Sequence, residues 1–380
     1  MSFSMFYKNA RIYGADFQFH TGAFEVTEEG LFGTVLPENV PADAVDLQGA
    51  TVIPGLVDVH IHGAMGADFS DGDAQGISDM AKYLLTQGVT SFAPASMTLP
   101  YEVLEKAFAT AAKVHSQQSD DQARLMGIHM EGPYFSEKKK GAQNGAYLKK
   151  PDFAGFKALQ EGCGGLVKIV DVAPELPGAA EFVEQAKALC TVSVAHTDSD
   201  YDHAKAAYDA GATHLTHLYN AMPGIHHRNP GVIPAAAENQ NVRAELICDG
   251  MHVHPASVRL AFSMFGPERM VLISDALRCC GMPDGEYELG GQQVFLSGGV
   301  ARLADGTIAG SATNLFSCMR KAMEFGIPEE AAIRAATYNP ACAIGAAEKI
   351  GSIETGKYAD FIVCSPDYTA IRVFRGGKEI

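Results

Sequence analysis

Two short apolar runs that each end in a histidine constrain the fold of this chain more than any other feature. Residues 192–196 and 213–217 are rich in apolar and β-branched side chains and end in His196 and His217. Residues 201–211, between them, carry alanine and tyrosine at helical spacing and end in glycine. A strand, a helix and a second strand form a parallel pair whose carboxyl ends lie side by side. Either histidine alone has an ordinary interpretation as a hydrogen-bonded core residue, but the pair indicates two metal ligands.

The same alternation of an apolar run with a helical segment recurs along the chain. The predicted strands are residues 56–62, 88–96, 124–131, 166–173, 192–196, 213–217, 242–249 and 270–275. Eight strands that alternate with helices predict an α/β fold of the (β/α)8 type, the TIM barrel. A doubly wound sheet is the alternative, but such a sheet does not bring side chains from widely separated strands to one point.

Polar side chains stand at the carboxyl ends of these strands, where a barrel collects its catalytic groups. They are His60, His62, Glu131, His196, His217, Asp249 and Asp275. Because His60 and His62 alternate along one strand, they share a metal ion only if that strand bends or bulges. Four histidines, a glutamate and an aspartate on one face together predict a divalent metal site, although each has a structural interpretation by itself. Nitrogen and carboxylate ligands without a thiolate suit Fe²⁺, Mn²⁺, Co²⁺ and Zn²⁺, of which we expect Zn²⁺.

The two ends of the chain depart from this pattern, because both are short strand-like runs interrupted by glycine and proline. Chain termini often lie close together. We therefore expect residues 1–55 and 350–380 to form one small β-sandwich domain, and residues 56–349 to form the barrel. Late in the barrel segment, Ser311 is predicted to cap a helix that runs from residue 309 to residue 325.

Charge and cysteine usage narrow the class of protein. The chain has 29 Lys and Arg against 45 Asp and Glu, a formal net charge of -16, which argues against nucleic-acid and anionic-membrane partners. An anionic small substrate needs only a local basic group and is not excluded. The eight cysteines form no C-x-x-C pair, and no signal peptide or run of membrane-spanning length precedes or interrupts the strands. We expect a cytoplasmic protein with free thiols.

Several motifs resemble a known family. The run Pro54-Gly-Leu-Val-Asp-Val-His-Ile-His62, placed after a β-domain, resembles the opening of the amidohydrolase superfamily. Six further motifs resemble one branch of this superfamily, the N-acetylglucosamine-6-phosphate deacetylases. They are His129-Met-Glu-Gly-Pro133, Gly141-Ala-Gln-Asn, His217-Leu-Tyr-Asn-Ala-Met, Asp249-Gly-Met-His-Val-His254, Ser274-Asp-Ala and Ala309-Gly-Ser. The resemblance spans essentially the whole chain. The first and third of these branch motifs are specific to the branch, whereas His-x-His indicates only the superfamily.

The resemblance implies a reaction and the groups that perform it. The reaction is hydrolysis of the N-acetyl group of an amino-sugar 6-phosphate to the amine and acetate, with one or two divalent metal ions per subunit. The implied metal ligands are Glu131, His196, His217, His60 and His62. Glu131 is implied to bridge two ions, because the His60 and His62 pair holds a second ion in those members that have it. Asp275 is implied to be the catalytic acid and base.

The resemblance also implies a substrate pocket. The implied substrate contacts are Ala142, Gln143, Asn220, Ala221, Arg228, His252, Ile308 and Ala309. Arg228 is expected to bind the phosphate in the site of a neighbouring subunit, which implies a homodimer. Gln143 stands where some relatives carry histidine. An amide donates a hydrogen bond but carries no proton at neutral pH, so Gln143 is expected to contact a sugar hydroxyl or the phosphate. The preference between the N-acetylglucosamine and N-acetylgalactosamine epimers stays open.

Two competing interpretations come from different classes. Another amidohydrolase, acting on a cyclic amide or an N-acyl amino acid, does not need the phosphate contacts at Arg228 and Asn220-Ala221. A non-catalytic barrel scaffold does not need the metal ligands, and in this chain every ligand position is filled by a residue that binds metal.

Overall fold

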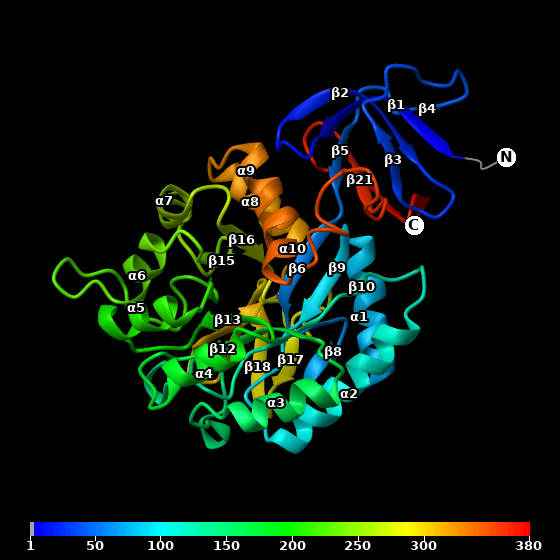
Figure 1. Ribbon diagram of the computed structural model, residues 1–380. Helices are drawn as coiled ribbons and strands as arrows, with labels where there is room; N and C mark the ends of the chain where they lie inside the picture. The colour runs from blue at the N-terminus through cyan, green and yellow to red at the C-terminus, as the bar shows by residue number, and fades with distance from the viewer. Residues whose placement is uncertain (1–3) are drawn as a thin grey trace.

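Parallel strands form the centre of the molecule. The computed structural model describes residues 4–380 (Figure 1). The parallel strands are β6 (Leu56–Ile61), β9 (Val89–Pro94), β10 (Arg124–Leu125), β11 (Ile128–Met130), β12 (Val167–Val172), β13 (Thr191–Val194), β14 (His214–Leu215), β15 (Arg243–Ile247) and β16 (Met270–Ile273). They pair in sequence order, β6 with β9 and β10 in one sheet and β11 through β16 in a second. The parallel-strand α/β class is thus confirmed.

Hydrogen bonds join the two parallel sheets at both of their edges. A parallel bridge pairs Ala95, just after β9, with His129 of β11. On the other side, the Asp275 amide donates to the His60 carbonyl at 2.9 Å, and the His62 amide donates to the Ala276 carbonyl at 2.9 Å. The carboxyl ends of the first and last strands are therefore held next to each other.

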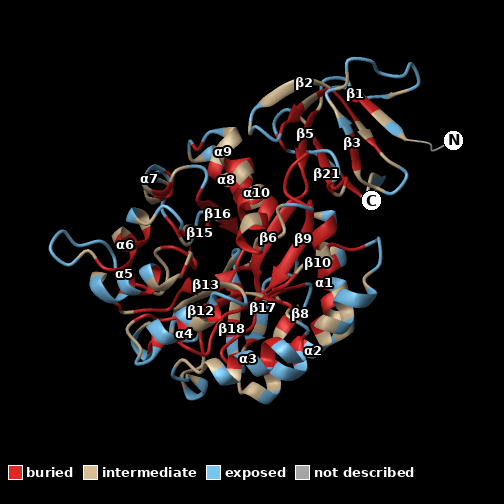
Figure 2. Ribbon diagram, viewed as in Figure 1, coloured by how far each residue is buried: buried red, intermediate tan, exposed pale blue. Residues whose placement is uncertain are grey.

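Helices follow most of these strands and cover the outside of the strand layer (Figure 1). They are α1 (Ala74–Thr86), α2 (Tyr101–Gln117), α3 (Phe153–Gly162), α4 (Ala179–Ala186), α5 (Tyr201–Ala210), α6 (Val232–Glu238), α7 (Pro255–Phe265), α8 (Leu315–Glu324), α9 (Glu329–Ala336) and α10 (Tyr338–Ala343). Figure 2 shows that the strands are buried and that the helices around them are exposed on their outer faces. Across residues 4–380, no helix combines the length and the hydropathy needed to cross a membrane.

Helix α5 illustrates how local sequence defines these elements. The Asp200 side chain accepts a hydrogen bond from the His203 amide and so caps the first turn. Ala204 and Tyr208 face the core, as their spacing predicts. Gly211 ends the helix at a φ of 124°, which a side chain would disfavour. The predicted helix between the two histidine-bearing strands is confirmed.

Strands from both ends of the chain form one eight-stranded sheet. Its members are β1 (Met5–Tyr13), β2 (Phe19–Val26), β3 (Phe32–Val35), β4 (Val45–Asp46), β5 (Thr51–Pro54), β21 (Phe361–Cys364), β22 (Ile371–Arg375) and β23 (Lys378–Glu379). Strand β5 pairs antiparallel with β21, so that Val52 lies opposite Val363. The two ends therefore pair in space, whereas the sandwich architecture stays a prediction. Residues 1–3 of the predicted N-terminal segment lie outside the described residues.

A four-stranded antiparallel sheet follows β16, and only its last strand takes the place of the start of a predicted helix. It consists of β17 (Gly285–Leu289), β18 (Gln292–Ser297), β19 (Val300–Leu303) and β20 (Ile308–Ser311). The predicted helix start at residue 309 and the Ser311 cap are wrong: β20 pairs with β19, and α8 begins after Asn314, whose side chain accepts from the Ser317 amide. Ser311 instead donates its hydroxyl to the Ser274 carbonyl. Pairing partners distant in sequence outweigh the local capping signal here.

Candidate metal centre and active site

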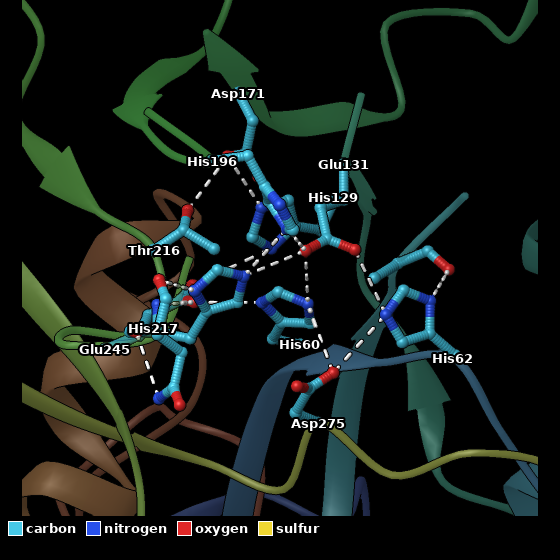
Figure 3. A network of polar contacts seen from close by, with 12 residues as sticks. His60, His62, His129, Glu131, Asp171, His196, Thr216, His217, Glu245 and Asp275 are labelled. Carbon is cyan, nitrogen blue, oxygen red and sulfur yellow. Dashed lines mark hydrogen bonds and ion pairs between the residues drawn. The ribbon is translucent and has the colours of Figure 1, made fainter. Parts of the chain in front are cut away.

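Six predicted side chains converge at the carboxyl ends of the parallel strands (Figure 3). They are His60 of β6, His62 just after it, Glu131 after β11, His196 after β13, His217 after β14 and Asp275 after β16. A register shift between Asp58 and Ile61 in the pairing of β6 with β9 supplies the irregularity that lets His60 and His62 face the same region.

The backbone turns sharply at three of these strand ends. His196, His217 and Asp275 have φ values of 43°, 30° and 48°, in the left-handed region that residues other than glycine rarely adopt. Each such residue costs of order 1–3 kcal/mol and persists where the surrounding structure holds it. The turn carries each side chain away from the direction of its strand and into the shared site.

Glu131 lies at the middle of the cluster. Its Oε1 is 3.1 Å from Nε2 of His196 and 3.1 Å from Nε2 of His217. Its Oε2 is 3.1 Å from Nε2 of His62, and Nε2 of His60 lies 3.5 Å from Oε1. The carboxylate therefore contacts all four histidines, three through Oε1 and one through Oε2, which is compatible with a bridging ligand.

Asp275 completes the side of the cluster that carries His60 and His62. Its Oδ1 lies 3.3 Å from Nε2 of His62 and 3.6 Å from Nε2 of His60. At 8% exposure, Asp275 is more accessible than His60, which is fully buried. The aspartate therefore touches both the ligand cluster and the open space next to it.

The hydrogen bonds of the ring Nδ1 atoms fit metal binding. His196 Nδ1 donates to the Lys139 carbonyl at 2.9 Å, His217 Nδ1 to the Asn220 carbonyl at 3.2 Å, and His62 Nδ1 to the Ala95 carbonyl at 3.2 Å. A carbonyl only accepts, so Nδ1 carries a hydrogen, and Nε2 is the nitrogen left to bind a metal ion once it is deprotonated. All three Nε2 atoms face the Glu131 carboxylate.

Three groups of donor atoms are close enough to hold a metal ion. The first is Glu131, His196 and His217, the second is His60, His62 and Asp275, and the third, below them, is His60, His129 and Glu245. His60 Nε2 is buried and has no hydrogen-bond partner among the described residues, although it points into the cluster. A metal ion would use this lone pair. Nitrogen and oxygen donors suit Zn²⁺, Fe²⁺, Mn²⁺ and Co²⁺.

A cavity opens beside the ligand cluster. Every predicted substrate contact except Arg228 lines it. Met97, Ile247 and Thr307 also line it and were not predicted. The β17–β20 sheet forms one wall, because Ile308 and Ala309 belong to β20. A concave site with a few converging polar groups is the usual form of a small-molecule site.

Comparison with known proteins identifies the family. The model of the amidohydrolase family matches residues 51–380. The chain belongs to the amidohydrolase family. Its resemblance to that family, inferred above from the motifs, is thereby confirmed.

Relatives of this amidohydrolase include deacetylases of two amino-sugar phosphates. The N-acetylglucosamine-6-phosphate deacetylase of Bacillus subtilis (strain 168) is 39% identical over 335 residues, which are 87% of this chain and 83% of the relative. The N-acetylgalactosamine-6-phosphate deacetylase of Escherichia coli O157:H7 is 33% identical over 336 residues, 88% of each chain. A solved structure of a mutant N-acetyl-D-glucosamine-6-phosphate deacetylase from Mycobacterium smegmatis, in complex with N-acetyl-D-glucosamine-6-phosphate, superposes with a TM-score of 0.93 at 33% identity and covers 99% of both chains.

Arg228 is the one predicted substrate residue of this amidohydrolase that the structure does not bring to the cavity. It is exposed, and its Nη1 lies 2.7 Å from Nε2 of His227. The loop that carries it extends outward between β14 and α6 (Figure 1). Its role in the site of a second subunit stays a prediction.

Gln143 is held by protein groups on both sides of its amide. Its Nε2 donates to Oε2 of Glu131 at 2.9 Å, and its Oε1 accepts from the Thr98 amide at 2.8 Å. This contact with the central carboxylate was not predicted. Because the Thr98 amide can only donate, the orientation of the Gln143 amide is defined, and its N–H groups face Glu131 and the cavity.

A second, deeper layer of polar residues was missed by the sequence analysis. Glu245 of β15 and Asp171 of β12 are fully buried carboxylates that contact the histidines below the cavity (Figure 3). A signal for them exists in the sequence, since each is an acidic residue inside an otherwise apolar run. Buried charges need partners, so such residues point to a network.

The pKa values of His62 and of Glu131 in the cluster shift in opposite directions. Burial would lower the pKa of His62, but the hydrogen bonds to Asp275 and Glu131 outweigh it and raise the pKa to about 10. Burial would raise the pKa of Glu131, yet the charge of His60 and the hydrogen bonds from His196 and His217 hold it well below its usual range. The metal-free cluster therefore pairs a carboxylate with protonated imidazole.

We expect metal affinity to rise with pH. If His62 is a ligand, its Nε2 must lose the proton that it carries in the metal-free protein below a pKa of about 10. The apparent affinity for metal should increase about tenfold per pH unit for each proton displaced, between pH ~6 and ~9. Titration of the metal-free protein with Zn²⁺ in several buffers measures this slope. An affinity that does not change with pH would contradict the protonated state.

Proposed function

We propose that this amidohydrolase is a metal-dependent deacetylase that hydrolyses N-acetylglucosamine 6-phosphate to glucosamine 6-phosphate and acetate. The observation that carries the proposal is the two-sided cluster around Glu131, which opens on a cavity beside Asp275. Relatives that align over most of the chain and are named as such deacetylases support the substrate class.

The proposed ligands divide between two ions. Glu131, His196 and His217 would hold the first, and His60 with His62 would hold the second, with Glu131 between them. Bound there, a divalent ion supplies a water of lowered pKa and polarises the acetyl carbonyl. This chemistry is needed because an amide is a weak electrophile with a poor leaving group.

Asp275 is proposed to move the proton. Burial would raise the pKa of Asp275, but the hydrogen bond from His62 and the charge of His60 lower it, so the group is ionised and ready to act as a base. Its carboxylate takes a proton from the attacking water and then gives it to the sugar nitrogen, so that the amine leaves neutral. The position of Asp275 between the cluster and the cavity supports both steps.

The cavity walls are proposed to position the sugar. Asn220 and Ala221 would contact the phosphate, and His252 would contact a sugar hydroxyl, oriented by Asp249, whose carboxylate lies 2.7 Å from its Nδ1. Ala142, Ile308 and Ala309 would enclose the ring and the acetyl group. Zinc as the ion, a homodimer, a cytoplasmic location and the domain limits at residues 55 and 350 are proposals from the sequence.

We expect Arg228→Ala to raise KM for the phosphosugar by about 10- to 100-fold, since a hydrogen bond between charged groups contributes about 1.5–3 kcal/mol. The change in kcat should be small, because Arg228 does not touch the reacting amide. Steady-state acetate release measures both constants. The unphosphorylated sugar is the control, and its turnover should not change. Full activity of the variant on the phosphosugar would favour an amidohydrolase of another specificity.

Acetate release from three substrates tests the proposed function. The protein loaded with Zn²⁺ is given N-acetylglucosamine 6-phosphate, its galactosamine epimer and unphosphorylated N-acetylglucosamine. Fastest release from the first substrate is the expected result. Preference for the galacto epimer would keep the mechanism and change the substrate, an outcome for which the Escherichia coli O157:H7 relative is a precedent. Release from none of the three would overturn the substrate assignment.

A further inference from the structure

Glu245 occupies a position where a carboxylate is costly. It lies in β15 between Ala244 and Leu246, and it is fully buried. Glu245 does not line the cavity, so it is not one of the candidate substrate contacts. A buried carboxylate without partners would cost several kcal/mol, so its contacts indicate why the chain has it.

Every contact of the Glu245 carboxylate leads to the histidine-bearing strands (Figure 3). Oε2 accepts from Nδ1 of His60 at 2.9 Å and from the backbone amide of His217 at 3.3 Å. Oε1 accepts from Nε2 of His214 at 3.0 Å. Oε1 also lies 3.7 Å from Nδ1 of His129 in β11. One side chain of β15 thus links β6, β11 and β14 below the cluster of candidate ligands.

The contact with His60 determines which ring nitrogen is free. A carboxylate accepts a hydrogen bond, so His60 carries a hydrogen on Nδ1, and Nε2 is the ring nitrogen left to bind a metal ion. That Nε2 has no hydrogen-bond partner among residues 4–380 and points between Glu131 Oε1, at 3.5 Å, and Asp275 Oδ1, at 3.6 Å. The other three candidate ligand histidines are held by backbone carbonyls, and only His60 is held by a charged group.

We propose that Glu245 is a positioning residue for the second metal ion: it fixes the orientation and tautomer of His60 so that the Nε2 lone pair faces the ion. A carboxylate behind a ligand histidine also makes the imidazole a stronger donor. This inference rests on the proposed two-metal function, and it assigns to Glu245 a role that touches neither substrate nor metal.

Metal binding to variants of the full-length protein tests the inference. Glu245→Met keeps an unbranched side chain of similar length but removes the acceptor. We expect its second Zn²⁺ to dissociate with a constant about 10- to 100-fold higher than in the unchanged protein, while the first ion stays bound. Zn²⁺ titration of the metal-free protein and elemental analysis after dialysis give the affinity and the number of ions. Glu245→Asp, which keeps the charge but shortens the side chain, is the second variant if Glu245→Met fails to fold, and it should weaken the same ion.

Two further variants separate positioning from general stability. Asp171→Leu removes another fully buried carboxylate, which bonds His129 Nε2 at 2.9 Å and contacts no candidate ligand; it should retain both ions. In a His60→Ala background, Glu245→Met should not change metal binding further, because its effect passes through His60. A Glu245→Met protein that binds two ions with unchanged affinity would overturn the inference. If the protein without any substitution binds no metal ion, the proposed function itself would be overturned instead.

Discussion

Asp275→Asn is expected to lower kcat for acetate release by about 10²- to 10⁴-fold, the usual contribution of a general acid and base. An amide cannot take a proton from water at neutral pH, and it has none to give to the leaving nitrogen. Asp275 and Glu131 both border the cavity and contact His60 and His62, but only Glu131 also contacts His196 and His217. No neighbouring carboxylate is therefore placed to take over its role, since Glu131 is occupied by three histidines.

Two measurements keep this result interpretable. The metal content of Asp275→Asn should stay at or near that of the unchanged protein for the ion between Glu131, His196 and His217, which do not depend on Asp275. Binding of the phosphosugar, measured without turnover, should change less than kcat. A variant that keeps more than about a tenth of the activity would contradict the role of Asp275 as the proton carrier.

Removal of metal with a chelator is expected to abolish acetate release and to lower the melting temperature. The Nε2 atoms of His196 and His217 lie 3.1 Å apart and both face one oxygen of Glu131. A metal ion held by these three residues would satisfy all of them. Metal at about 1,000 times its dissociation constant adds about 4 kcal/mol to stability, which for a chain of this size raises the melting temperature by about 5 °C.

Readdition of Zn²⁺, Fe²⁺, Mn²⁺ or Co²⁺ in turn should restore activity and melting temperature together. Calorimetry and acetate release on the same samples measure both. Glu131→Gln provides the matched control, because it removes the central charged ligand without changing the size of the side chain. Its melting temperature should not respond to metal. Full activity after exhaustive chelation would exclude the metal-dependent mechanism.

The candidate catalytic and metal-binding residues could be predicted because the sequence shows both where the strands lie and where each strand ends. Apolar runs of strand length identify the core, and in a parallel arrangement all carboxyl ends share one face. Glu131, His196, His217 and Asp275 each follow such a run, so their convergence followed from their positions in the sequence alone. The helix predicted over residues 201–211 is also confirmed, because its cap at Asp200 and its end at Gly211 are local interactions.

Other features depend on contacts that no local pattern contains. Ile308 and Ala309 reach the cavity as part of strand β20, because pairing with β19 outweighs the capping preference of Ser311. Gln143 contacts Glu131 because Thr98, distant in sequence, holds its oxygen. These outcomes are decided by the free energy of pairing and of satisfying buried polar groups, which depends on what the folded chain brings near.

The sequence by itself determined the parallel α/β class and which polar side chains stand at the strand ends, since periodicity and strand-end position are local properties. Only the tertiary structure decided the left-handed turns at His196, His217 and Asp275 and the partner of each ring Nδ1. It also placed Glu245 behind His60. An acidic residue within an apolar run indicates that the folded protein must supply it with a partner. Which partner it contacts depends on the packing of strands far apart in the chain.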